Sequence, residues 1–178
     1  AVADEGADLR KAGINSSIMI MNPEITAFKT MFDYRLEPEV YSFHLLEELI
    51  KAAEREGVSN FPIHIKIDTG MHRLGFAPEE MPQLVQRLQK QSAVIPRSVF
   101  SHLVGSDAER FDAFTRHQIE KPLLPYFSKV SNTRLSVISA TRQESNVIRV
   151  HSLTWYVWES DSTASTRLPT RCCTMSPP

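Results

Sequence analysis

Two short strings, each following an apolar run, carry the residue types most suited to chemistry. Residues 66–76 read KIDTGMHRLGF, a segment that turns through two glycines with charged groups on both sides. Arg73 in this string can present a planar, always-charged donor to an anionic or phenolate oxygen. Taken alone, a solvated loop arginine is the commoner interpretation, so the string defines a candidate anion-binding residue only.

The second string is SHLVGSD, residues 101–107, in which His102 ends an apolar run and precedes a glycine turn. A histidine at a strand end fits a satisfied core position as well as a functional one. Four other histidines lack the spacing of a metal-ligand set: His44, His64, His72 and His117. We therefore predict no metal site.

The elements that would position these strings alternate between strands and helices. Apolar runs predict strands at 18–21, 40–43, 62–68 and 99–103. Helical spacing and glycine stops predict helices at 5–12, 27–34, 45–53, 78–91 and 111–127. Such alternation with short connections favours an α/β fold with a parallel sheet and helical crossovers.

The predicted strand at 62–68 has two chemically different faces. Side chains alternate along a strand, so the three isoleucines 63, 65 and 67 share one face, while His64, Lys66 and Asp68 share the other. The isoleucine face suits packing under helices. The polar face fits either the interior of a barrel near its carboxyl-terminal rim or an edge strand with one wet face.

Composition narrows the classes of function. The chain has 178 residues and a formal net charge of −1, which gives no argument for a nucleic-acid partner. There is no apolar run long enough to span a membrane, and the acidic start does not resemble a signal peptide. The two cysteines, Cys172 and Cys173, are adjacent, so we expect neither a structural disulfide nor a zinc site. We also expect the protein to reside in a reducing compartment.

Five segments in the first 130 residues together resemble the alanine racemase family. KIDTGMHRLGF (66–76) followed by SVFSHLVGSD (98–107) is the most specific pair. AVADEGADLRKAGI (1–14), SIMIMNPE (17–24) and LEPEVYSF (36–43) are weaker matches in the right order. We therefore expect residues 1–134 to form part of a pyridoxal-phosphate-binding (β/α)8 barrel of the TIM type, roughly from its second strand to its sixth helix.

The resemblance also implies roles for three residues. Arg73 matches the arginine that contacts the cofactor's phenolic oxygen and the substrate carboxylate. Lys66 matches a lysine that is often carbamylated (N6-carboxylysine) and holds that arginine in place. His102 matches the histidine that supports the arginine beneath the pyridine nitrogen. A carbamate on Lys66 would pair with Arg73, whereas an ammonium would repel it.

The resemblance further implies a cytoplasmic homodimer that interconverts L- and D-alanine for peptidoglycan. The family's cofactor lysine lies on the first barrel strand, and its second base, a tyrosine, lies in a C-terminal β domain. We find a match for neither, so we assign no catalytic residue with certainty and expect an inactive fragment. The alternative is a non-catalytic barrel that binds pyridoxal phosphate or a partner.

Residues 135–178 match nothing in the family as they stand, and we expect a poorly ordered tail. If the reading frame of this segment is shifted by one base, the codons permit a sequence that resembles the family. Trp155 followed by Tyr156 then forces a valine codon, and Trp158 followed by Glu159 forces a glycine codon. Over residues 141–165 the remaining codons permit NSAGIERHPRAQFDMVRLGIGLYGV, which resembles the family's last two barrel strands. A frame-shifted tail is therefore our interpretation of this segment.

Overall fold

A computed structural model describes residues 2–102, 109–111, 113–114, 117–118, 136–140 and 155–157, with the side chains left out at 109, 136–140 and 155–157. The described strands form one parallel sheet in the order β1-β2-β3-β4-β5-β6. Their bounds are β1 Met19–Ile20, β2 Glu37–Val40, β3 Phe61–Lys66, β4 Val94–His102, β5 Ser136–Ala140 and β6 Trp155–Val157.

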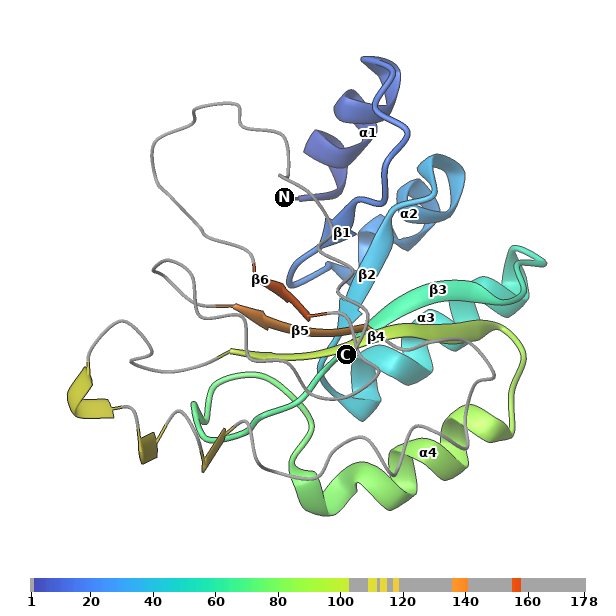
Figure 1. The fold of residues 1–178 in the computed structure, drawn as a ribbon. Coiled ribbons are helices and arrows are strands. Elements are labelled where there is room, and N and C mark those ends of the chain that lie inside the picture. Colours follow the sequence, from blue (N-terminus) through green and yellow to red (C-terminus); the bar gives the residue numbers. More distant parts are fainter. Residues whose placement is uncertain are drawn as a thin grey trace, which may run out of the picture.

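Helices follow the strands along one side of this curved sheet, as Figure 1 shows. The α-helices are α1 Ala3–Lys11, α2 Phe28–Tyr34, α3 Phe43–Arg55 and α4 Met81–Gln89. Short 3-10 turns cover Ile25–Ala27, Pro78–Glu80 and Glu109–Phe111. None of the described helices has the length and hydrophobicity needed to cross a lipid bilayer. The α/β class and the partial-barrel architecture expected from the sequence are confirmed.

The main core lies between the helices and the outer face of the sheet. Ile63, Ile65 and Ile67 of the third strand segment are almost fully buried, as the alternation predicts. Helix α3 contributes Leu46 and Leu49, which have no exposed surface. Burying one such side chain stabilises the fold by about 1.5–3 kcal/mol, so this apolar contact holds the strands in place. The opposite face of the sheet is then left for polar groups.

Strand β2 begins and ends earlier than the sequence predicts. We expected a strand at 40–43, but the strand is Glu37–Val40 and helix α3 begins at Phe43. The Ser42 hydroxyl accepts a hydrogen bond from the backbone N–H of Leu45 at 3.3 Å, which caps the helix and ends the extended chain. The sequence pattern did not predict a strand at 37–40 because two glutamates are atypical of a buried sheet.

The structure decides between the two interpretations of the polar face of β3. The strand lies between β2 and β4 and is therefore not an edge. His64 is 6% exposed and Lys66 is 5% exposed, so the face is not wet either. The edge-strand interpretation is wrong, and the polar residues line the inner face of a curved parallel sheet. Strand β4 is also longer than expected and begins at Val94 instead of Val99.

Two short strands come from the segment that we expected to be a poorly ordered tail. Strand β5 pairs in parallel with β4, and β6 pairs in parallel with β5. That the tail as a whole is poorly ordered stays a prediction. The frame-shift interpretation concerns codons and stays a prediction. Within the predicted helix at 111–127, Phe111 ends a 3-10 turn, positions 113–114 and 117–118 are helical, and the other positions lie outside the described residues.

Candidate functional site

The inner face of the sheet carries its polar side chains in two layers. The first, which we call the lower layer, comprises Glu37, His64, Arg97 and Ser98. The second, which we call the upper layer, lies two residues closer to the carboxyl end of each strand. It comprises Glu39, Lys66 and the apolar Phe100. The register joins β3 to β4 through the pairs His64–Ser98 and Lys66–Phe100. The register of β2 and β3 sets Glu39 beside His64, but the side chain of Glu37 contacts His64 and that of Glu39 contacts Lys66. By these contacts, β2 supplies a glutamate and β3 a basic residue in each layer.

Directional hydrogen bonds close the lower layer. His64 Nε2 lies 2.8 Å from Glu37 Oε2, and His64 Nδ1 lies 2.6 Å from Ser98 Oγ. Each ring nitrogen of His64 therefore has one polar partner, and the tautomer decides which nitrogen donates and which accepts. Arg97 donates to Glu37 Oε1. Burial alone would raise the pKa of Glu37, but the hydrogen bond from His64 and the charges of His64 and Arg97 lower it.

An ion pair forms the upper layer. Lys66 Nζ lies 2.6 Å from Glu39 Oε1, and the two side chains are 6% and 1% exposed. The backbone N–H of Asn22 donates to the other oxygen, Glu39 Oε2, at 2.8 Å. Lys66 Nζ also lies 5.7 Å from the centroid of the Phe100 ring. The ion pair lacks hydrogen-bond geometry, and Glu39 Oε1 has no aligned donor among the described residues.

Above the upper layer, the loop after β3 folds back on the sheet. The backbone N–H of Asp68 donates to Phe76 O at 2.9 Å. Asp68 Oδ1 in turn accepts from the backbone N–H groups of Gly70 at 2.9 Å and His72 at 3.0 Å. Gly75 has a φ of +132°, and a Cβ there would lie 2.6 Å from Asp68 N. The tight loop thus fixes the backbone from which the exposed Arg73 extends.

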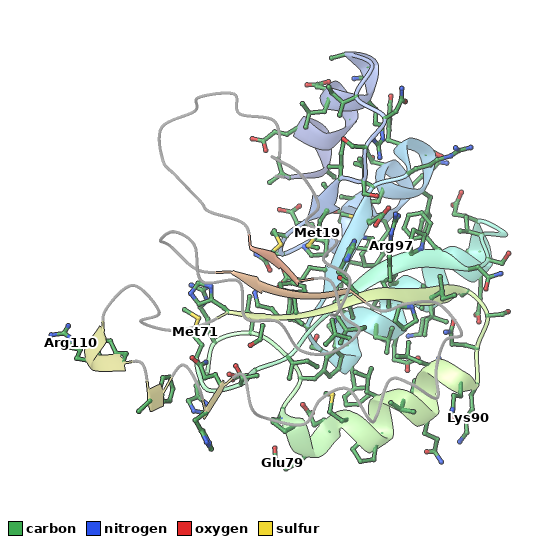
Figure 2. The ribbon with its side chains drawn as sticks, viewed as in Figure 1. Met19, Met71, Glu79, Lys90, Arg97 and Arg110 are labelled. Carbon is green, nitrogen blue, oxygen red and sulfur yellow. The ribbon has the colours of Figure 1, made fainter. Side chains whose placement is uncertain are left out.

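The three residues singled out from the sequence are brought to one end of the sheet. His102 ends β4, two residues beyond Phe100. Burial lowers the pKa of His102, and the positive charges of Arg73 and Lys66 lower it further. The imidazole is therefore neutral at pH 7 and lies within the field of both cations. Figure 2 labels one residue of each part of the inner face. Met71 belongs to the loop that also carries Arg73, and Arg97 belongs to the lower layer.

A buried glutamine links the Arg73 loop to β4. Gln118 is 2% exposed, and its Nε2 lies 3.1 Å from Thr69 Oγ1 and 3.4 Å from the carbonyl oxygen of His102. Thr69 Oγ1 also lies 2.7 Å from Ser101 Oγ. These contacts join the loop, the strand end and the following helical segment. Gln118 is therefore a positioning residue for the Arg73 loop.

Sequence reasoning missed Gln118 and both glutamates of β2. A usable signal existed for the glutamates, because Glu37 and Glu39 stand two residues apart in an apolar context, as His64 and Lys66 do. Matching periods of opposite charge on neighbouring strands predict buried pairs on one face. No comparable signal marks Gln118. Among the described residues, no group of three or more His, Cys, Asp or Glu side chains is arranged to hold a metal ion.

Fold and site together define a class of protein. A parallel α/β sheet of the barrel type, with Lys66, His102 and the Arg73 loop at the carboxyl ends of its strands, places the site where barrel enzymes bind their ligands. A family model described as "Alanine racemase, N-terminal domain" matches residues 1–123. The chain therefore belongs to the alanine racemase family, and the matched part is its N-terminal domain.

Relatives and solved structures agree with this assignment. Alanine racemase 1 of Clostridium acetobutylicum is 37% identical over 123 residues, which cover 68% of this chain and 31% of the relative. The alanine racemase of Clostridium tetani is 32% identical over 124 residues, covering 68% and 31%. The solved alanine racemase of Clostridium difficile 630 has a TM-score of 0.69 and 25% identity, covering 79% of this chain and 37% of that chain. This chain spans about a third of the length of these relatives.

Proposed function

We propose that this chain is the barrel part of an enzyme that interconverts L- and D-alanine with pyridoxal phosphate as cofactor. The observation that carries the proposal is the family match together with the position of Lys66, Arg73 and His102 at one end of the sheet. In the cell, the proposed role of this enzyme is to produce D-alanine for peptidoglycan in the cytoplasm. A homodimer is the proposed assembly.

The residues present suit an anionic cofactor. Burial lowers the pKa of His102 most, and the charges of Arg73 and Lys66 add to this, so both side chains lie near the same strand end. Lys66 is paired with Glu39, and Arg73 is the exposed cation there. Arg73 is the residue proposed to hold the phenolic oxygen of the cofactor and the carboxylate of alanine, because its planar fork donates two parallel hydrogen bonds. When bound, pyridoxal phosphate withdraws electrons from the α-carbon of the substrate. His102 is proposed to support the arginine that lies beneath the pyridine nitrogen of the cofactor.

A chimera tests this proposal, because it supplies the regions that the relatives carry outside the match. Residues 1–123 of this chain, which the family model matches, replace the corresponding segment of the Clostridium acetobutylicum relative. We expect the chimera to form D-alanine from L-alanine only when pyridoxal phosphate is present. Arg73→Lys should lower turnover by at least about tenfold, because an ammonium cannot reproduce the donor fork. Arg55→Lys on the exposed end of α3 is the matched control and should leave turnover unchanged.

The competing interpretation is a non-catalytic barrel that binds pyridoxal phosphate or a partner. It predicts that the folded chimera binds the cofactor, visible by its absorbance, without forming D-alanine. That result would overturn the racemase proposal and leave cofactor binding intact. A chimera that folds and binds no cofactor would contradict both interpretations.

A further inference from the structure

The upper layer contains two opposite charges that are almost excluded from solvent. Lys66 Nζ and Glu39 Oε1 are 2.6 Å apart, and neither side chain exposes more than 6% of its surface. A buried carboxylate costs several kcal/mol of desolvation unless a cation compensates it. The charge of Lys66 therefore decides whether Glu39 can remain ionised at this position.

We infer that Glu39 is a positioning residue that neutralises Lys66 and keeps it an unmodified ammonium, in place of the carbamate implied by resemblance. A carbamate on Lys66 would put a second anion beside Glu39 where solvent screening is weak. Two like charges in contact at low effective dielectric repel by several kcal/mol. Glu39 thus supplies from the neighbouring strand the negative charge that a carbamate would supply from Lys66 itself.

The surroundings of the pair fit a lysine cation. The Asn22 N–H holds Glu39 Oε2 at 2.8 Å, which fixes the carboxylate with Oε1 directed at Lys66. On the other side, Lys66 Nζ lies 5.7 Å from the centroid of Phe100, a distance at which an aromatic face attracts a positive charge and repels a negative one. Carboxylate and ring therefore favour the same charge on Lys66.

The inference has a consequence for the ligand-binding end of the sheet. If Glu39 neutralises Lys66, Arg73 is the cation that remains available to an anionic ligand, and the site needs no carbon dioxide to assemble. The use of Arg73 by a ligand rests on the proposed function. The charge of Lys66 does not, since it concerns side chains that are paired without any ligand.

Carbon-13 NMR of the 178-residue chain in 13C-bicarbonate at pH 8 tests the inference directly. The N-terminal amine and surface lysines give a background of carbamate resonances, which the variant Lys66→Arg preserves. We expect the spectra of the wild type and of Lys66→Arg to coincide in the carbamate region. A resonance that is present in the wild type and lost in Lys66→Arg would overturn the inference.

A second measurement follows the charge of the pair through His102, whose imidazole can be titrated by NMR. Glu39→Gln leaves the charge of Lys66 uncompensated, so the midpoint of the His102 titration should move to a lower pH. Glu47→Gln, which removes a carboxylate from the surface pair with Arg87, should leave it unchanged. An unchanged His102 midpoint in folded Glu39→Gln would also overturn the inference. Neither readout needs cofactor or activity, so failure of the racemase proposal is detected separately.

Discussion

The two layers of the inner face use the same kinds of residue and achieve different things. In the lower layer, His64 makes a directional contact through each ring nitrogen, and Glu37 receives a second donor from Arg97. In the upper layer, Lys66 and Glu39 share an ion pair without hydrogen-bond geometry. A closed hydrogen-bond network fixes one arrangement of the strands, whereas an ion pair fixes mainly the local charge.

Their positions along the strands match this difference. The lower layer lies nearer the amino ends of the strands, where barrel residues contribute chiefly to stability. The upper layer lies next to His102 and the Arg73 loop at the carboxyl ends, where barrel sites bind ligands. We conclude that the lower layer holds the sheet together and that the upper layer sets the charge of the site. Each prediction below separates these two roles.

The largest expected effect is that of Lys66→Met. This change leaves Glu39 buried and unpaired, and removal of one partner of a buried ion pair costs about 3–5 kcal/mol. The double variant Lys66→Met with Glu39→Gln should recover most of that loss, because no buried charge remains. Urea unfolding of the single and double variants measures both values. Equal stability of the wild type and Lys66→Met would show that Glu39 finds compensation elsewhere.

Ser98→Ala in the lower layer should cost less, about 1–2 kcal/mol. The variant leaves the buried Nδ1 of His64 without its hydrogen-bond partner at 2.6 Å, while the contact of His64 with Glu37 remains. Ser92→Ala, in the exposed turn before β4, is the matched control and should be nearly neutral. Thermal unfolding of the two variants side by side provides the measurement, and identical midpoints would remove the lower layer from the stability account.

Some features of the fold and of the candidate site could be predicted from the sequence, and others could not. The parity of β3 was predictable because three isoleucines alternate with polar residues, and the glycine-bounded helices were predictable from their apolar stripes. The site strings were recognisable because Lys66, Arg73 and the threonine–glycine turn stand in one short segment. The pairing of side chains across strands could not be predicted, because the partners of Glu37 and Glu39 are defined only when β2 lies beside β3.

A smaller effect concerns the response of the lower layer to acid. The pKa of Glu37 lies below its ordinary value of 4.5 in the folded chain, so the folded state binds this proton less readily than the unfolded state. Its contribution to stability is complete above pH 4.5 and is lost as the pH falls through the folded-state pKa. Glu37→Gln should therefore flatten the loss of stability below pH 4.5. A slope as steep as that of the wild type would contradict the lowered pKa.

The smallest effect belongs to His102 at the upper rim. Its pKa lies below the ordinary value of 6.5, because burial and then the charges of Arg73 and Lys66 disfavour the imidazolium. The unfolded chain consequently binds the proton first, and stability should decline as the pH falls below 6.5. His102→Gln should remove this part of the decline, while His44→Gln on helix α3 serves as the control. Matching pH profiles for the wild type and His102→Gln would refute the prediction.

Turnover per folded molecule in the racemase chimera tests the division between the layers most directly. Ser98→Ala and Glu39→Gln are compared at a temperature at which circular dichroism shows both to be folded. We expect Ser98→Ala to keep the turnover of the parent within about twofold, because its loss falls on stability, and Glu39→Gln to lose about tenfold or more, because it changes the charge beside Arg73. Equal losses in the two variants, or a larger loss in Ser98→Ala, would contradict the account.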